Sequence, residues 1–203
     1  SDKTNIIVTA RDKKKGSYDL KIKKVDQNNN PVSGVKFYVK ETSKSFMGSI
    51  AVAKDPTDSN GYVEIAKQDL DEDDVGKQDS YEISEIDLGS NTGLVKLKDP
   101  VTIFVNKGLN DDKSAYIAKS VSFDGNSVVT EKEVDLENNA GKVKITASIE
   151  GNSITVTIPN KKVYSLNIIK KDKDNNIITS GEATFSVRMY QTLHNNLDSW
   201  EME

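Results

Sequence analysis

The chain has 203 residues, of which 35 % are hydrophobic and 30 % are charged, which fits a globular chain with a modest core. Its net charge of −4 and its cations, nearly all lysines interleaved with acids, argue against nucleic acid as a partner. The absence of cysteine excludes disulfides and thiolate chemistry. No apolar run is long enough to predict a membrane span.

Short alternating runs bounded by Gly, Asn and Asp predict β-strands along the chain. In chain order they cover residues 18–25, 35–39, 62–65, 81–86, 101–105, 143–149 and 153–158. The string TDSNG at 57–61 predicts a hairpin turn, and EGNS at 150–153 predicts a tight turn joining the last two strands. No helical periodicity is convincing, although 66–75 could hold one short turn. The pattern predicts an all-β, immunoglobulin-like sandwich.

A segment near the beginning of the chain occurs again 146 positions later. The string YDLKIKKVD at 18–26 returns as YSLNIIKKD at 164–172, and both copies continue through Asn-rich turns to Ser-Gly and an aromatic strand. Self-similarity at a fixed spacing indicates an array of modules. We therefore predict one β-sandwich module at 17–162 and the start of a second, incomplete module at 163–203.

The two ends of the chain differ from these modules. Residues 1–16 are interpreted either as a linker or as the last strand of a preceding module, because 5–15 resembles 153–162. Residues 188–203 contain the only His, His194, and the only Trp, and we interpret them as an atypical tail. A lone His without a second His or a Cys predicts neither a metal site nor a catalytic triad.

The first predicted strand carries a lysine at its inward-facing end. Since strand side chains alternate, Leu20, Ile22 and Lys24 share one face. A lysine buried with them would tend to lose its proton and become a nucleophilic amine. The alternative is that Lys24, at the end of the strand, extends its amine to solvent.

Two other apolar faces end on a polar residue in the same way. Glu85 follows Tyr81 and Ile83 on one face, and burial there would favour a protonated carboxyl that can relay protons. Asn160 follows Ile158 on the last strand, and its carboxamide carbon is an electrophile. An Asn after Pro is also a common turn residue.

Four strings together resemble the Cna B-type (SpaA-type pilin) domain, an immunoglobulin-like, prealbumin-like module of Gram-positive adhesins and pilins. They are LKIKKVD at 20–26, PVSGVKF at 31–37, TDSNGY at 57–62 and the Tyr81-x-x-x-Glu85 spacing. The resemblance covers residues 17–162, and its first part recurs at 164–187. Two departures stand out: IDLGSNTGL at 86–94 replaces the usual Thr-x-Ala-Pro-x-Gly-Tyr, and residues 106–141 are additional.

The resemblance implies an autocatalytic isopeptide bond between the first and last strands, promoted by an acid on a central strand. By position, Lys24 would be the nucleophile, Asn160 the acceptor and Glu85 the acid, with Lys170 as the candidate lysine of the second module. Such a reaction needs no cofactor or metal and occurs once per molecule, so the chain is not expected to be an enzyme.

The resemblance also implies an extracellular, cell-wall-associated location and a role as a stalk or shaft module. The implied partners are neighbouring repeats of the same chain, other pilin subunits or a host surface ligand. The alternative is a ligand-binding adhesin domain that uses the 106–141 insertion, with exposed Tyr116 or Phe123 as its sign. A hydrolase on a transthyretin-like sandwich lacks the histidine or nucleophile–base pair it needs.

Two acidic strings begin like calcium-binding loops. They are Asp26-x-Asn28-x-Asn30 and its repeat at 172–176. The sixth position of each lacks the required Gly and the twelfth lacks Glu, so both are predicted to be hairpin turns. The acidic run at 69–74 is predicted to be a solvated loop.

Overall fold

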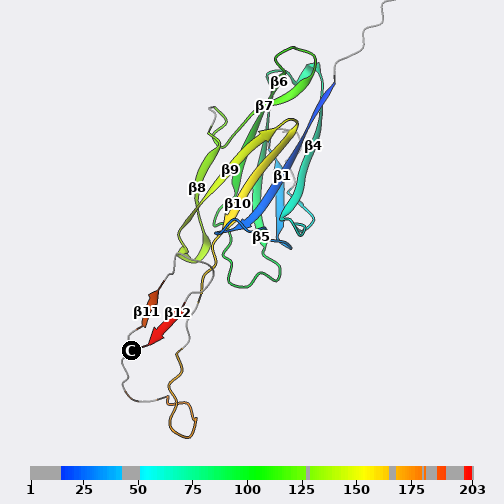
Figure 1. The fold of residues 1–203 in the computed structure, drawn as a ribbon. Coiled ribbons are helices and arrows are strands. Elements are labelled where there is room, and N and C mark those ends of the chain that lie inside the picture. Colours follow the sequence, from blue (N-terminus) through cyan, green and yellow to red (C-terminus); the bar gives the residue numbers. More distant parts are fainter. Residues whose placement is uncertain are drawn as a thin grey trace, which may run out of the picture. The chain divides into compact units, whose positions relative to one another are not determined.

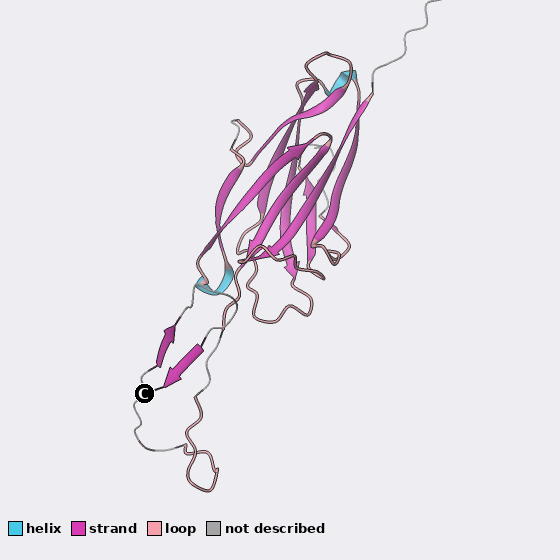
Figure 2. Ribbon diagram, in the orientation of Figure 1, coloured by secondary structure: helices cyan, strands magenta, loops and turns pink. Residues whose placement is uncertain are grey.

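The computed structural model describes residues 15–42, 51–126, 129–164, 168–179, 181, 187–190 and 199–202. The chain divides into two compact units, Ser1–Tyr164 and Ser165–Glu203. The first unit is a sandwich of two five-stranded sheets (Figure 1). Strands dominate it, and its two 3₁₀ turns lie at opposite ends (Figure 2). The predicted all-β sandwich is thus confirmed.

The two sheets of the first unit are of equal size. One has the order β4-β1-β10-β9-β8, and the other has the order β3-β2-β5-β6-β7. Neighbouring strands are antiparallel except β1 and β10, which pair in parallel. The bounds are β1 Gly16–Asp26, β2 Lys36–Glu41, β3 Val52–Ala53, β4 Tyr62–Leu70, β5 Gln78–Asp87, β6 Val101–Leu109, β7 Tyr116–Ser122, β8 Glu131–Asp135, β9 Lys142–Glu150 and β10 Ser153–Asn160, with the 3₁₀ turns η1 Glu72–Asp74 and η2 Glu137–Asn139.

The core lies between the sheets and follows the two-residue period of the strands. Every second residue is buried along the central parts of β1, β5 and β10. On β1 the buried face runs from Tyr18 through Leu20 and Ile22 to Lys24. The apolar face of each of these three strands ends on a buried polar side chain. The three side chains are Lys24, Glu85 and Asn160, and they meet between the sheets.

All the strands expected in the first unit form, and three more in that unit were not expected. β3 has only two residues, and β8 exposes most of its side chains at a sheet edge, so neither has an apolar alternation to detect. β7 does alternate and buries Tyr116, but it falls in the segment interpreted as an insertion. Residues 106–141 therefore supply the end of β6 and an edge strand of each sheet.

One predicted turn has a different structural context. Gly61 has a φ of 78°, and Asp58 N donates to Tyr62 O, so the chain does reverse there. The expected hairpin is wrong, because β3 and β4 lie in different sheets. Turn residues specify a local reversal, whereas the burial of the flanking strands decides their partners. The turn between β9 and β10 forms as predicted, with Gly151 at a φ of 59°.

The described part of the second unit contains one pair of strands and one turn. β11 (Val187–Tyr190) pairs antiparallel with β12 (Ser199–Met202). Of residues 1–16, interpreted as a linker or a strand, 1–14 lie outside the described residues, as does His194 in the tail, and Gly16 belongs to β1. In the described part of the chain, no helix has the length and apolarity needed to span a membrane.

The turn of the second unit reproduces that of the first, bond for bond. Asp26 Oδ1 accepts from the backbone N–H of Asn28 and Asn30, and Asp172 Oδ1 accepts from the backbone N–H of the residues at 174 and 176. Val32 N donates to Lys24 O at 2.9–3.0 Å, as Ile178 N does to Lys170 O. The positive-φ asparagines correspond as well, at 69° for residue 29 and 71° for residue 175. The turn that follows the repeated segment is therefore repeated in backbone conformation as well as in sequence.

Candidate functional site

Lys24, Glu85 and Asn160 come together at one end of the core of the first unit. Lys24 lies on β1 opposite Ile158 of β10, so Asn160 is one side-chain step further along the same face. Glu85 approaches from β5 in the other sheet. The side chains of Lys24 and Glu85 are fully buried, and Asn160 is 0 % exposed. The structure thus brings together all three residues proposed for one reaction.

Lys24 is held inside the core by the backbone around it. Its N–H donates to Gly61 O at 2.7 Å, and its carbonyl accepts from Val32 N at 3.0 Å. A Cβ at position 61 would lie 2.3 Å from Lys24 O, so only glycine permits this approach. Two loops therefore cover the end of β1, and the lysine stem cannot extend to solvent as the alternative required.

The Lys24 amine has one hydrogen-bond acceptor and one neighbouring charge. Nζ donates to Ile158 O at 2.9 Å and lies 3.3 Å from Glu85 Oε1. Burial lowers the pKa of Lys24 from 10.5 to about 8, against the opposing effect of the Glu85 carboxylate. The amine therefore gives up its proton much more readily than a surface lysine does.

The Glu85 carboxyl connects the amine to the carboxamide. Oε2 accepts from Leu97 N at 2.9 Å and from Asn160 Nδ2 at 3.0 Å. Among the described residues, Glu85 Oε1 and Asn160 Oδ1 are the buried side-chain atoms without a hydrogen-bond partner. Such an atom costs about 1–3 kcal/mol and calls for an explanation. A 180° rotation of the carboxamide would place Oδ1 beside Oε2, where a protonated carboxyl can donate to it.

A second buried lysine, Lys107 on β6, has the opposite environment. Its Nζ donates to Asp74 Oδ1 and to Asp79 Oδ1, both at 2.8 Å. Burial by itself lowers the pKa of Lys107, but the hydrogen bonds and charges of the two aspartates outweigh it and raise the pKa. Lys107 therefore stays an ammonium ion, whereas Lys24 is the lysine that can act as a nucleophile.

Lys107 belongs to a buried network that the sequence reading missed. Tyr18 on β1 donates its OH to Asp79 Oδ2 at 2.6 Å and shares a 2.7 Å hydrogen bond with the Tyr81 hydroxyl. The network joins β1 to β5 across the sandwich at the end of β1 opposite Lys24. The strand period could have indicated this network. Asp79 lies on the same buried face of its strand as Tyr81, and Lys107 lies on the same buried face as Val105.

The remaining predicted positions have no comparable surroundings. Lys170 is exposed in the second unit. The Asp26 and Asp172 carboxylates accept backbone hydrogen bonds within their turns. In the described part of the chain, no group of three or more potential ligands could hold a metal ion. In the acidic run, Asp74 has a structural role that the prediction of a solvated loop did not include, since it pairs with Lys107.

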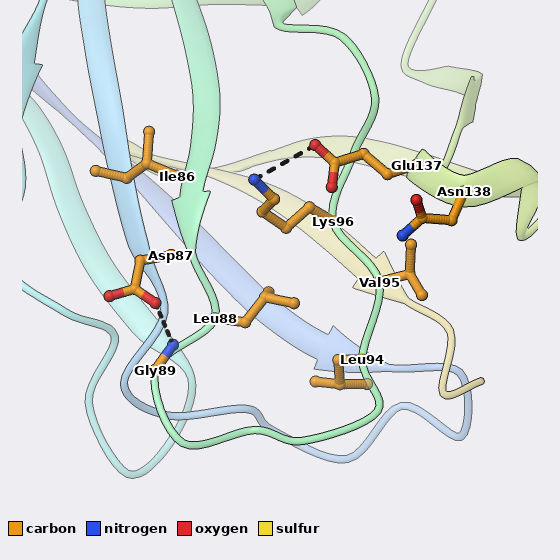
Figure 3. A pocket seen from close by; sticks show the side chains of 9 residues that line it. All are labelled: Ile86, Asp87, Leu88, Gly89, Leu94, Val95, Lys96, Glu137 and Asn138. Atoms are coloured by element: carbon orange, nitrogen blue, oxygen red, sulfur yellow. Dashed lines mark hydrogen bonds and ion pairs between the residues drawn. The ribbon is translucent and has the colours of Figure 1, made fainter. Parts of the chain in front are cut away.

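A pocket of about 240 Å³ lies next to the residues that follow Glu85 in the chain (Figure 3). It is lined by residues 86–89 at the end of β5, by 94–96, and by Glu137 and Asn138 of η2. Lys96 and Glu137 form an ion pair at 3.3 Å within it. The pocket marks where the loop after β5 meets η2, close to the backbone that contacts Glu85.

The fold and the cluster define a class of protein: a prealbumin-like β-sandwich whose first and last strands run side by side in parallel. The chain matches the family model described as the SpaA prealbumin-like fold domain over residues 18–119, about half of its length, and it belongs to this family. Lys24 and Glu85 lie inside the matched region, and Asn160 lies beyond it. No curated protein matches the sequence.

Several solved structures of pilus proteins are similar to the chain. A C-terminal fragment of the pilus adhesin SpaC from Lactobacillus rhamnosus GG is 18 % identical, with a TM-score of 0.43, and the match covers 74 % of this chain and 47 % of that one. A streptococcal ancillary pilin is 15 % identical (TM-score 0.32; 92 % and 46 % covered). The major pilin BcpA of Bacillus cereus is 16 % identical (TM-score 0.27; 72 % and 30 % covered). The chain thus spans less than half the length of each.

Proposed function

We propose that the first unit is a structural module of a bacterial cell-surface pilin or adhesin, stabilised by an isopeptide bond between Lys24 and Asn160. The observation that carries this proposal is the buried cluster: the Lys24 amine lies 3.3 Å from one Glu85 oxygen, and the Asn160 carboxamide lies 3.0 Å from the other. The proposed setting is extracellular and cell-wall-associated, with neighbouring modules or pilin subunits as partners. Lys170 is the proposed counterpart of Lys24 in the second unit, because the turn after it is the same.

The proposed reaction starts with a neutral Lys24 amine and a protonated Glu85. Nζ attacks Cγ of Asn160, and the carboxyl hydrogen-bonds to Oδ1 and stabilises the charge that develops there. As the C–N bond to Nδ2 breaks, Glu85 gives its proton to the departing nitrogen and takes one from Nζ. One amide replaces another, one ammonia leaves, and Glu85 ends in its starting state. The step is a self-reaction with a single turnover, not enzymatic catalysis.

The intact mass of the chain tests the proposal directly. We expect a mass about 17 Da below the value calculated from the sequence, corresponding to one ammonia. Tandem mass spectrometry after proteolysis should recover a branched peptide joining the segment around Lys24 to that around Asn160. An intact mass equal to the calculated one would refute the cross-link.

Substitutions at the cluster provide the controls for this measurement. Lys24→Ala removes the nucleophile and should abolish the mass loss, and Glu85→Ala should leave both reactants unjoined. Lys107→Ala should leave the mass loss intact, because Lys107 is buried in an ion-paired network away from the cluster. Loss of ammonia in Lys24→Ala would assign the reaction to another amine.

The pH dependence of the reaction separates two roles for Glu85. The reactive state pairs a neutral amine with a carboxylic acid, and it forms from the ion pair of ammonium and carboxylate by moving one proton between the two groups. Both states bind the same number of protons, so the ratio of their populations does not depend on pH. The last proton leaves at the Lys24 pKa of about 8. Above that pH the pair has no proton left for the departing nitrogen, and we expect the rate to fall about tenfold per pH unit.

The rate can be measured on newly synthesised chain from cell-free translation. Portions are transferred to buffers between about pH 6 and pH 10 and quenched with acid at intervals. Mass spectrometry then gives the fraction of chains that have lost ammonia at each time. If Glu85 did not act as an acid, the reaction rate would depend only on the fraction of Lys24 that is deprotonated. The rate would then rise up to pH 8 and level off above it, which would contradict the proposed role.

A ligand-binding function through residues 106–141 lacks an observation in its favour. Tyr116 is 9 % exposed and Phe123 is 6 % exposed, and both pack in the core. The insertion completes the two sheets, so the aromatic contact surface that this alternative requires is not built from these residues.

A further inference from the structure

The segment that follows β5, Gly93–Lys98, is bound on one side to the continuation of β10. We call it the strap. Val95 N donates to Lys161 O at 3.1 Å, and Val163 N donates to Gly93 O at 2.7 Å. Leu94 and Lys162 are bridge partners. The first half of the strap is therefore fixed to the residues directly after the acceptor, Asn160.

The second half of the strap is bound to the residues around η2. Lys98 N donates to Asp135 O and Glu137 N donates to Lys96 O, both at 2.9 Å, with Leu97 and Leu136 as bridge partners. The Lys96–Glu137 ion pair reinforces the contact (Figure 3). Neither ladder uses the N–H of Leu97. That N–H donates instead to Glu85 Oε2 at 2.9 Å, and the Leu97 side chain is buried.

The hydrogen bond from the Leu97 N–H bears on the orientation of the Glu85 carboxyl plane. The terminal torsion of a glutamate has a broad minimum, so burial alone leaves the carboxyl plane poorly defined. With Oε2 bound to Leu97 N and Asn160 Nδ2, Oε1 is the oxygen that lies 3.3 Å from the Lys24 amine. The carboxyl therefore has one end at the nucleophile and the other at the leaving nitrogen, as a relay between them requires.

We propose that Leu97 is a positioning residue for cross-link formation, whose backbone N–H holds the Glu85 carboxyl so that its two oxygens face Lys24 and Asn160. The inference rests on the proposed Lys24–Asn160 reaction and assigns to the strap a part in it. The strap ties this donor to the strand of the acceptor, so the acid and the acceptor keep a common alignment. Any residue except proline supplies an N–H, so the identity of the side chain at 97 is not what matters.

Leu97→Pro removes the N–H, with Val95→Pro as its matched control. Proline is tolerated where no ladder hydrogen bond is lost, which is the case at 97. Val95→Pro removes one backbone hydrogen bond of the same strap, to Lys161, without touching Glu85. We expect Leu97→Pro to lose ammonia about 10- to 100-fold more slowly than the unchanged chain, since misplacement of a reacting group costs factors of this size. Val95→Pro, which keeps the donor at position 97, should react at nearly the unchanged rate.

A second variant covers the case in which Leu97→Pro does not fold. Replacing residue 97 by the α-hydroxy acid of leucine exchanges the N–H for an ester oxygen and keeps the side chain, and it should slow the reaction to the same extent. The contact has a readout independent of the reaction. In Lys24→Ala, which cannot cross-link, the Leu97 amide proton should resist hydrogen exchange, and adding Glu85→Ala should remove that protection.

The outcomes separate the two proposals. If the unchanged chain does not lose ammonia, the proposed cross-link fails. If it does, but the ester variant reacts at the unchanged rate, the positioning inference fails and the cross-link stands. Equal slowing by Val95→Pro and Leu97→Pro would also overturn the inference, because it would show a general effect of loosening the strap.

Discussion

Lys24→Met is expected to lower the melting temperature of the first unit by roughly 10–20 °C. The Lys24–Asn160 bond would close most of the module into one loop, and loop-closure entropy for that length corresponds to about 5 kcal/mol. Methionine fills nearly the volume of the buried lysine stem. It also leaves the Glu85 carboxyl without its partner amine, so part of the loss belongs to the side chains and not to the bond. Differential scanning calorimetry of the two purified proteins measures the difference.

A double-mutant cycle separates the bond from the side chains. Glu85→Gln preserves the shape of Glu85 and blocks the reaction, so it should destabilise the unchanged chain by a similar amount. In the Lys24→Met background, where no bond can form, the same substitution should have a much smaller effect. Equal effects of Glu85→Gln in both backgrounds would show that the bond does not stabilise the module.

Asp79→Ala is expected to reduce the free energy of unfolding by about 3–5 kcal/mol, because it removes one partner from a buried ion pair. Asp79 is 4 % exposed and accepts from both Tyr18 and Lys107. Its removal leaves the Lys107 ammonium with Asp74 alone and frees the Tyr18 hydroxyl from its carboxylate partner. Chemical denaturation with urea measures the loss.

Asp74→Ala is the control for this prediction. Asp74 contacts the same lysine, but its side chain is 23 % exposed, so its removal should cost about 1 kcal/mol or less. Both variants should still lose ammonia, since their network lies at the other end of β1. Equal destabilisation by the two substitutions would contradict the assignment of Asp79 as the centre of the network.

Strand alternation made the candidate site accessible from the sequence. The two-residue period is a local property, so it placed Lys24, Glu85 and Asn160 on inward faces without any knowledge of which strands pair. It did not reveal that β1 and β10 are neighbours, which came from the resemblance to a family. The predicted hairpin at 57–61 failed for the same reason, because strand partners depend on burial across the whole sheet.

Several of the missed features lack a signal in the sequence, although the inward positions of Asp79 and Lys107 could have been predicted from the strand period. The donor at Leu97 is a backbone N–H, which nearly every residue possesses. The edge strand β8 has too few buried side chains to show an apolar period. The pairing of Lys107 with Asp74 joins positions 33 residues apart, and composition alone does not connect them.

The parallel register of β1 and β10 would give the proposed Lys24–Asn160 bond a mechanical consequence. Gly16 and Asn160 lie at opposite ends of the paired strands, so tension applied through the two ends of the module runs along β1 to Lys24 and leaves through Asn160. Residues 25–159 lie outside that path. Without the bond, their unravelling would lengthen the chain by roughly 450 Å. With the proposed bond, the loaded segment would be the first part of β1, which is already extended, and the module would act as an inextensible link.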